Sequence, residues 1–472
     1  MSLTLVYQRC FPISGGMSDN SNTLVDANWR RGTGIGFSEF NLTVPWATAG
    51  VLIATALDLN TQLKWRWCYI IGTIYGAVSL LGTLLFYFPP SRPQYDFEKS
   101  RMQELVELDW IGFVLYTVGL TITMIGLTWA GSPSHPWRSA STIAPIVVGV
   151  LTLAACFIYD FTLAKNPFFP LPVFKLVIFE VISVFVAGMI FYSMAGLLPQ
   201  ATMYCFTNDP MEIGWVQLPN GFGQLFFGGL VCLFMGKLGH LKLQVIVMLV
   251  LQTVFVGLYA AVVPSNRAAW MAFQFFGNGP FTLLTLVCYV LVGLNVPLRH
   301  IGVASGLIGT FRSAGGAFGN AIFNTILHSV SGREVPKRLA EVVFWNDLPS
   351  SILAELIPAA LQNADGIPGA FDAFDLSADV QSQVALAVRD SYAYAFRMVF
   401  YSTIPFGVIA IIGACFIKDA SQYLTNHTAV QMQREGVLGK ASVAERAPES
   451  PKAAQVESGA GSDNSAAFSK TQ

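Results

Sequence analysis

Charge is the scarcest property of this sequence. Only 12% of its 472 residues are charged, 27 basic and 28 acidic, against about 25% in an average soluble domain. Of these 55 side chains, 39 fall in four segments, at 1–40, 91–109, 329–393 and 418–472. A water-soluble globule needs charge over its whole surface, so this distribution excludes one. It also excludes a nucleic-acid binder, because the net charge is −1 and there is no basic surface.

Motifs that hold metals, phosphates or nucleophiles are also missing. The seven cysteines are an odd number, show no C-x-x-C or Cys/His metal spacing, and lie mostly in apolar runs, which indicates helix packing. The five histidines are scattered near the ends of those runs. No G-x-x-x-x-G-K-[ST] phosphate loop occurs. We therefore expect no enzyme activity, no cofactor and no bound metal.

Long apolar runs are what the sequence does have. A helix needs about 20 mostly apolar residues to cross a bilayer, and an open sheet would leave backbone groups unpaired there. The sequence predicts an all-α membrane protein with about ten transmembrane helices, of which the first is the weakest because its apolar part is short. The ten candidate spans are 40–57, 68–90, 109–130, 142–163, 179–204, 214–236, 243–263, 269–293, 301–327 and 394–417.

Basic residues in the short loops predict the orientation of these spans. One set of alternate loops carries eight Lys or Arg residues and the other carries four, and the richer set is expected in the cytoplasm. Both termini are then cytoplasmic, and 329–393 is an extracellular loop with four basic and nine acidic residues. Within this loop, 351–363 predicts a short helix, and Ser377 predicts the N-cap of a helix that leads into the last span. The tail 418–472 is expected to be disordered.

Amide side chains inside the spans indicate a substrate cavity, because lipid makes such groups costly. Three of them follow at steps of three and four on one face of 214–236, and two lie four apart in 301–327. An uncharged or weakly polar organic molecule suits such a lining, while hydrogen bonding between helices alone is the alternative. The predicted lining residues are Gln217, Asn220, Gln224, Asn320, Asn324, Gln200 and Tyr192.

One predicted span also carries a candidate moving element. Arg312 is the one cation well inside a predicted span, where it either forms a gate contact or extends to the cytoplasmic surface. Gly315 and Gly319 form a G-x-x-x-G pair, which permits two helices to approach closely, for packing alone or for motion.

A tight turn precedes the span at 243–263. Gly236 and Gly239 permit this turn, and Lys237 either holds helix ends whose carbonyls are negative or simply anchors the cytoplasmic side. We include all three residues in the conformational gate.

Several segments in order carry a resemblance to a known family. They are 63–70 (LKWRWCYI), 108–112 (LDWIG), 304–316 and 393–400 (AYAFRMVF), the last continuing through 418–427. Over roughly 45–430 the chain resembles the fungal trichothecene efflux pumps, which belong to the fourteen-helix drug:proton antiporters of the major facilitator superfamily. The resemblance implies a major facilitator fold of which this chain supplies the last ten helices, without the first four.

The resemblance also implies a division of the chain. Residues 1–39 form a polar segment, 40–90 a remnant of the N-terminal bundle, 91–178 a cytoplasmic loop with two linker helices, and 179–417 the C-terminal bundle. No Asp or Glu is expected deep in the nine stronger spans, so a carboxylate that couples transport to protons would belong to the absent helices.

These inferences combine into one hypothesis with open alternatives. The protein is expected to be a monomeric secondary transporter that moves small apolar organic compounds, toxins or drugs, outward across the plasma membrane by alternating access. Its partners would be the small-molecule substrate, the lipid bilayer and, as coupling ion, a proton. Uptake of siderophores or other solutes by the same fold is one alternative, and a truncated membrane protein that does not transport is another. The vacuolar membrane is the alternative location.

Overall fold

The structure, a computed structural model, describes most of the chain between residues 46 and 420. The described ranges are 46–86, 108–130, 138–164, 169–231, 238–296, 300–367, 369–374 and 376–420, with a few single positions between them. The predicted polar segment 1–39 and nearly all of the predicted disordered tail 418–472 therefore lie outside the described residues.

Helices make up the described architecture, as predicted. Each of the ten apolar runs overlaps a described helix, and six helices (α7, α8, α9, α12, α13 and α16) are long and apolar enough to cross a membrane. The elements are α4 (Trp46–Asn60), α5 (Arg66–Phe86), α7 (Trp110–Trp129), α8 (Ala140–Thr162), α9 (Leu171–Cys205), α10 (Pro210–Gln224), the π-helix η1 (Leu225–Val231), α12 (Leu241–Val262), α13 (Arg267–Asn295), α14 (Ile301–Trp345), the 3-10 turn η3 (Ser350–Ile352), α15 (Leu353–Ala364) and α16 (Ala378–Ala414).

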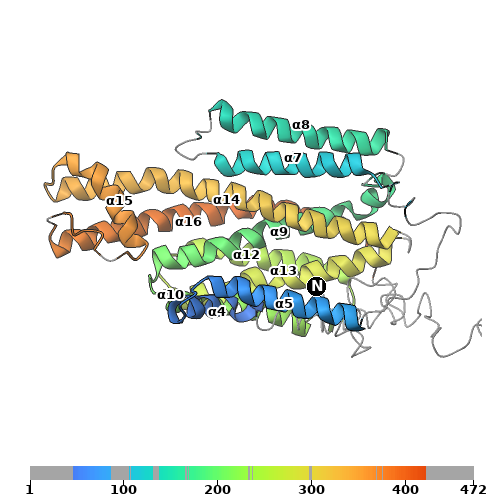
Figure 1. Ribbon diagram of the computed structural model, residues 1–472, viewed down its shortest axis with the longest axis horizontal. Coiled ribbons are helices and arrows are strands. Elements are labelled where there is room, and N and C mark those ends of the chain that lie inside the picture. The colour runs from blue at the N-terminus through green and yellow to red at the C-terminus, as the bar shows by residue number, and fades with distance from the viewer. Residues whose placement is uncertain are drawn as a thin grey trace, which may run out of the picture.

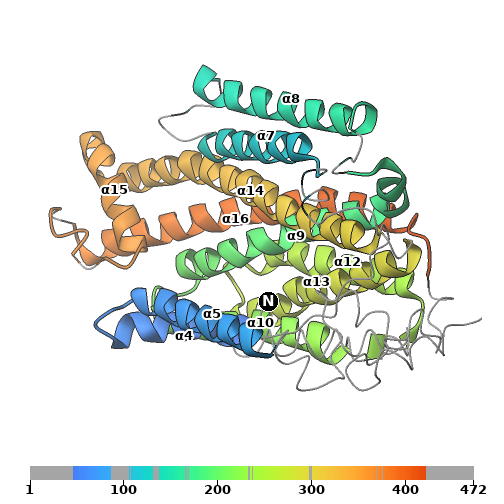
Figure 2. The same ribbon diagram turned by 45° about the vertical axis from the view of Figure 1, so that its right-hand side comes forward.

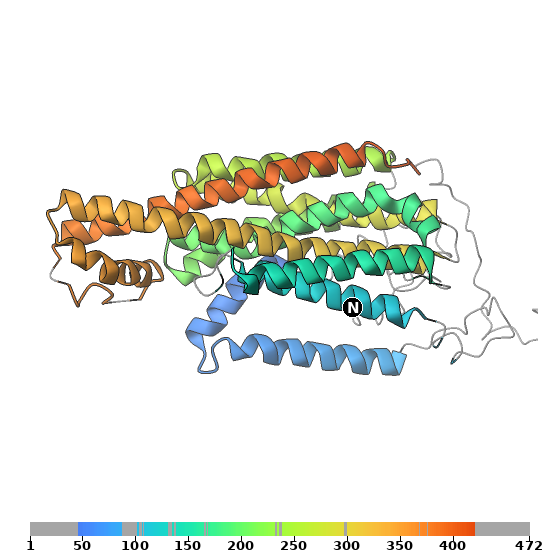
Figure 3. The same cartoon turned by 90° about the horizontal axis from the view of Figure 1, so that it is seen from above.

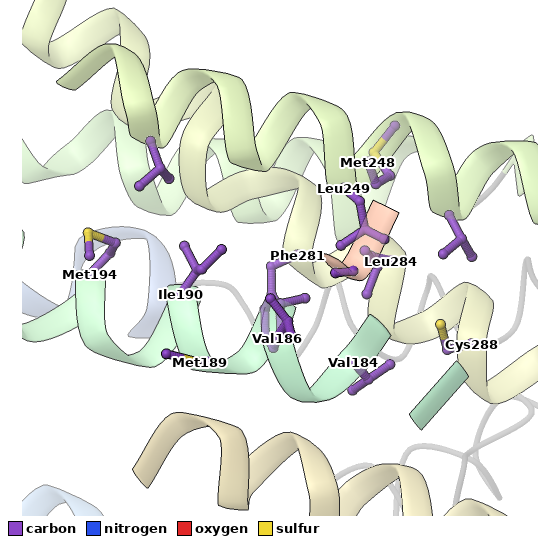
Figure 4. Close-up of a cluster of buried hydrophobic side chains, with 14 of the residues drawn as sticks. Val184, Val186, Met189, Ile190, Met194, Met248, Leu249, Phe281, Leu284 and Cys288 are labelled. Carbon is purple, nitrogen blue, oxygen red and sulfur yellow. The ribbon is translucent and has the colours of Figure 1, made fainter. Parts of the chain in front are cut away.

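The centre of the molecule is a bundle formed by α9, α10, α12, α13, α14 and α16 (Figure 1). Its core is apolar, and α13 is its most enclosed helix, with 78% of its most apolar part buried. Figure 4 shows side chains of α9, α12 and α13 meeting in this core, among them Ile190, Leu249 and Phe281. Such a core gives the bundle a fixed frame on which polar side chains can be positioned.

Two helical hairpins flank the bundle on opposite sides (Figure 2). The α7–α8 hairpin lies against α14, and α4 of the α4–α5 pair lies against α10. Only 22% of the most apolar part of α7 and 17% of that of α8 are buried within the protein. Because these helices are apolar on nearly all sides, their exposed faces suit contact with lipid.

Beyond the bundle, α14 and α16 continue and form an extension with α15 (Figure 3). We call residues 328–390 the helical extension; α14 does not end at residue 327, as the predicted span does, but at Trp345. A row of buried residues four apart continues through this part of α14 and explains the difference, because it packs on α15 and α16: Leu327, Ser331, Val335, Leu339 and Val343. The predicted short helix is confirmed as α15, and Ser377 caps α16 by accepting a hydrogen bond from the Val380 amide.

The contact between α9 and α14 is unusually close. A Cβ added at Gly315 would collide with the carbonyl oxygen of Phe185, and one at Gly319 with that of Met189. From the other side, a Cβ at Gly188 would lie 2.5 Å from the carbonyl oxygen of Arg312. We call Gly188, Gly315 and Gly319 the glycine seam. The close approach that the G-x-x-x-G pair predicts is therefore present, and its part in any motion stays a prediction.

Candidate functional site

A pocket of about 910 Å³ lies where the bundle meets the helical extension. Four helices line it, since α14 forms one long wall, α7 faces that wall, and α15 and α16 close the end. The lining side chains used below are Asn320, Asn324 and His328 of α14, Met124 and Thr128 of α7, Ile357 and Leu361 of α15, and Tyr392 of α16.

The pocket combines a row of polar side chains with walls that are mostly apolar and carry a few hydroxyl groups. Asn320, Asn324 and His328 stand four residues apart on α14, so they follow one face of the helix; we call them the polar row. The Nδ2 of Asn324 donates to the carbonyl oxygen of Asn320 over 2.8 Å, which orients this amide. Among the lining residues that the structure describes there is no Asp, Glu, Lys or Arg. The pocket thus offers neutral hydrogen-bonding groups together with apolar surface.

Tyr392 connects the pocket to the end of α9. Its ring stacks on that of Tyr204, with centroids 4.0 Å apart and an angle of 2° between the ring planes. The Tyr204 hydroxyl donates a 2.8 Å hydrogen bond to Oδ1 of Asp365, which directly follows α15. A second link runs from Nδ2 of Asn208 to the carbonyl oxygen of Asn363, over 3.5 Å. These contacts fix α15 over the end of the pocket.

Gln217, a predicted lining residue, lies inside the bundle instead. Its side chain is buried, and its Nε2 donates to Oγ1 of Thr202 over 3.0 Å. The indole Nε1 of Trp270 donates to the same oxygen over 3.1 Å. This network joins α10, α9 and α13, which corresponds to the alternative of hydrogen bonding between helices.

Four more of the predicted lining residues also lie outside the pocket. Asn220 and Gln224 are half-buried and pair with each other, Nε2 to Oδ1, over 3.4 Å. Gln200 is exposed near the end of α9, and Tyr192 packs beside Gly316, with its ring edge-on to that of Phe281. Of the seven predicted lining residues, the structure brings only Asn320 and Asn324 together in the pocket.

The predicted gate residues fall in two places. Arg312 is half-buried beside the glycine seam and makes no ion pair within the part of the chain that the structure describes. Gly236 and Lys237 lie outside the described residues. Gly239 has a φ of +58°, the left-handed conformation that favours glycine, and its carbonyl oxygen accepts a 2.7 Å hydrogen bond from Nε2 of Gln244.

Two carboxylates are buried in the described helices. Glu180, the second residue of the predicted span 179–204, is 1% exposed in the third turn of α9, which begins at Leu171. Burial among helices is not depth in a bilayer, so the expectation that no acidic residue lies deep in the stronger spans stays a prediction. Asp160 is 3% exposed and accepts a 2.9 Å hydrogen bond from the backbone amide of Phe169.

A second, smaller pocket of about 500 Å³ lies at the other end of the contact between α7 and α14. Its lining is mostly apolar and includes Trp110, Phe113 and Leu307. Asp109, also in the lining, caps α7 by accepting a 2.8 Å hydrogen bond from the Gly112 amide. Because this pocket is smaller and has fewer hydrogen-bonding side chains in its lining, we regard the larger pocket as the candidate site.

Sequence reasoning missed several residues of the larger pocket. His328 was detectable, because it continues the spacing of Asn320 and Asn324 by another four residues. It lies one residue beyond the predicted span, which ends at 327. Ile357, Leu361 and Tyr392 had no such signal, since their place in the pocket depends on how α15 and α16 fold back on α14.

Comparison with known proteins agrees with the resemblance. The chain matches the family described as "Fungal trichothecene efflux pump (TRI12)" over residues 42–463. The trichothecene efflux pump TRI12 of Fusarium sporotrichioides is 26% identical over 403 residues, which cover 82% of this chain and 66% of that protein. For the MFS-type transporter prx5 of Penicillium rubens the identity is 24% over 416 residues, 86% of this chain and 74% of the other.

A third relative is the trichothecene efflux pump TRI12 of Trichoderma arundinaceum, 28% identical over 416 residues, which cover 81% of this chain and 65% of that protein. The matched part of the chain thus spans about two thirds of the length of both TRI12 relatives. Because the family match covers nearly the whole sequence, the chain belongs to the fungal trichothecene efflux pump family, a group of multi-pass membrane transporters of the major facilitator type.

Proposed function

We propose that this protein exports small, neutral and mostly apolar organic molecules across a membrane by alternating access. The observation that carries the proposal is the pocket of about 910 Å³ with one polar row, a few hydroxyl groups and mostly apolar walls, in a chain that belongs to a family of efflux pumps. The plasma membrane is the proposed location.

The size and chemistry of the pocket support this class of ligand. Sites for small organic molecules commonly measure about 300–1,000 Å³ and combine apolar lining with a few polar groups that fix orientation. A charged ligand would lose its water here without meeting an opposite charge, which is unfavourable. A compact molecule with hydroxyl or carbonyl groups on one side would instead match the polar row.

The proposed motion places the pivot at the glycine seam. All ten helical segments on the predicted apolar runs would cross the bilayer, with the helical extension on the outer side. Alternating access needs helices that change their relative tilt around a fixed contact. The seam supplies such a contact, because the backbones of α9 and α14 touch there without side chains between them, and Arg312 lies beside it.

Efflux from cells tests the proposal. Cells that express the full chain would be loaded with a tritium-labelled trichothecene, and the loss of label would be compared with that from cells carrying an empty vector. We expect faster loss with the protein, and about tenfold slower transport in Asn320→Leu, which removes a polar group from the pocket at similar size.

A matched variant, Asn220→Leu, removes an amide that sequence predicts for the cavity but that lies outside the pocket. It should transport at the wild-type rate when present in the membrane at the same amount. Equal retention of label with and without the protein would reject export, and accumulation of label would favour uptake. A larger defect in Asn220→Leu than in Asn320→Leu would place the ligand path along α10 instead.

A further inference from the structure

The smaller pocket, of about 500 Å³, has no part in the proposed function. It lies between the start of α7 and the first turns of α14, within or directly beside the predicted spans 109–130 and 301–327. On α14 its lining residues recur at helical spacing and therefore share one face. They are Val303, Gly306, Leu307 and Thr310.

Gly306 leaves a bare stretch of backbone in this pocket. A Cβ added there would meet no atom within 4 Å, whereas one added at Gly315 of the same helix would collide with the backbone of α9. Glycine in a helix interior lowers stability relative to alanine, and at Gly315 the close packing of two helices offsets that loss. At Gly306 the described part of the chain supplies no such packing. A ligand with a flat surface would supply it.

The start of α7 adds an aromatic corner to the pocket. The ring centroids of Trp110 and Phe113 are 6.3 Å apart, and the ring planes meet at 85°. The two side chains are 52% and 46% exposed although they line a cavity. The pocket is therefore open beside the outer face of α7, which suits contact with lipid. A component of the bilayer could enter it from that side.

Asp109 gives one end of the pocket a hydrogen-bond acceptor. It directly precedes α7, at the first residue of the predicted span, which is the proposed membrane boundary. Its Oδ1 accepts the bond from the Gly112 amide, and a carboxylate oxygen can accept more than one hydrogen bond. A molecule with an apolar body and a single hydroxyl group at one end matches this arrangement, because the hydroxyl can donate to the carboxylate at the boundary.

The charge of the lining disfavours a phospholipid. The described lining residues include no Lys or Arg, and the one charged side chain among them is the acid Asp109. A phosphate group would thus meet a like charge instead of a cation. A flexible acyl chain also loses conformational freedom when it is held in a pocket, whereas a rigid ring system loses little.

We propose that the smaller pocket binds a membrane sterol. The fused rings would pack on the backbone at Gly306 and against the rings of Trp110 and Phe113, and the hydroxyl group would donate to Asp109. Sites for small organic molecules commonly measure about 300–1,000 Å³, a range that includes this pocket. The inference uses the proposed position of α7 and α14 in the bilayer, but neither the larger pocket nor export. A bound sterol would join the α7–α8 hairpin to α14.

Photolabelling tests this inference. The purified full chain in phosphatidylcholine nanodiscs would be illuminated with a photoreactive cholesterol analogue that carries a diazirine on its rings, and the adducts would be mapped by mass spectrometry. We expect adducts within 108–113 and 303–310, and their loss with excess unlabelled cholesterol. The corresponding ketone cannot donate a hydrogen bond to Asp109, so it should compete about tenfold more weakly.

A variant that fills the pocket provides a second readout. Gly306→Leu has open space for its side chain, so it should fold, and it should reduce labelling of the two segments about tenfold. Cholesterol should raise the unfolding temperature of the wild type but not that of Gly306→Leu, because only the wild type binds it. Gly76→Leu is the matched control, since Gly76 is an exposed glycine of α5 with equally open space, outside the pocket. It should behave as the wild type.

Several outcomes would overturn the sterol site. Adducts spread evenly over the outer faces of α5, α7 and α8 would show that the sterol is only part of the surrounding lipid, and unchanged labelling of folded Gly306→Leu would place it elsewhere. Labelling of the same segments by a photoreactive phosphatidylcholine that cholesterol does not displace would assign the pocket to an acyl chain. Equal competition by the ketone would overturn the bond to Asp109. Each of these results leaves the proposed export function intact.

Discussion

The inner and outer halves of α14 are held by different forces. In the inner half, Gly315 and Gly319 bring the helix backbone directly against α9. In the helical extension, the same helix buries Val335, Leu339 and Val343 against α15 and α16. The change takes place near Leu327, where the predicted membrane span ends.

The proposed membrane placement accounts for this difference. Lipid tails are as apolar as leucine, so helices in a bilayer associate by close packing of small residues rather than by the hydrophobic effect. Outside the bilayer, removal of apolar surface from water drives association. One continuous helix therefore carries a small-residue pattern in the predicted membrane and an apolar row beyond it. Substitutions in the two halves should have different consequences.

The largest effect is expected in the core of the helical extension. Leu339 is fully buried there, and Leu339→Ala should destabilise the extension by about 2–5 kcal/mol, because it removes apolar contacts and leaves a cavity. Hydrogen exchange of the amides at 335–345 would accelerate, while exchange in α12 and α13 should not change. Leu386→Ala on α16, where the side chain is 46% exposed, is the control. Equal acceleration throughout the bundle would mean that the two halves unfold together.

A smaller effect is expected at the glycine seam. Gly315→Ala places a methyl group against the backbone carbonyl of Phe185, which cannot rotate away. Overpacking of this kind costs about 1–3 kcal/mol, and thermal unfolding in detergent should report it. Gly306→Ala on the same helix meets no atom within 4 Å, so it should be neutral or gain up to about 1 kcal/mol from helix propensity. Equal stability of the two variants would show that the seam opens easily.

The contacts between α9 and α15 should contribute less to stability than the glycine seam does. Tyr204→Phe keeps the ring stacked on Tyr392 but removes the hydrogen bond to Asp365. Loss of a partly exposed hydrogen bond is expected to cost about 0.5–1.5 kcal/mol. Faster hydrogen exchange confined to α15 would be the sign of it. Tyr401→Phe, on an exposed part of α16, should leave exchange in α15 unchanged; if it does not, loss of a hydroxyl alone is not the cause.

The smallest effect concerns pH and the start of α10. Hydrogen bonds from Thr207 and Arg267 lower the pKa of Glu212 below its usual value. The contribution of these bonds is then complete above the unfolded pKa of about 4.3 and is lost as the pH falls through the lower, folded pKa. Unfolding temperatures between about pH 3 and 7 should show a slightly steeper acid-side decline in the wild type than in Glu212→Gln. Glu355→Gln on α15 should retain the wild-type decline.

The sequence predicted the positions of most helices because nine of the ten apolar runs are long enough to dominate their segments. The end of α14 was predicted wrongly because charged residues after 332 lower the hydropathy, although the four-residue row from Leu327 to Val343 continues through them. The mean hydropathy of a segment indicates whether it suits lipid, whereas the spacing of its apolar residues indicates which face packs on other helices. A helix that passes from one solvent to another can be followed only by periodicity.

Prediction of the site was less complete. Spacing placed Gln217, Asn220 and Gln224 on one helix face, but it does not show which neighbour that face meets. Thr202 and Trp270 come from other helices and engage Gln217. The pocket likewise depends on α7, α15 and α16 folding against α14, and no local pattern contains that information.

The length of α14 would make it a lever if the helix tilts at the glycine seam. From Gly315 to Trp345 it spans 31 residues as one helix, with Pro336 inside it. This arm measures about 45 Å, so that a tilt of about 5° at the seam would move the tip by about 4 Å. His328 lies on this part of α14, between Gly315 and Trp345. A small adjustment between two backbones deep in the bundle would thus be amplified where the pocket meets the outer solution.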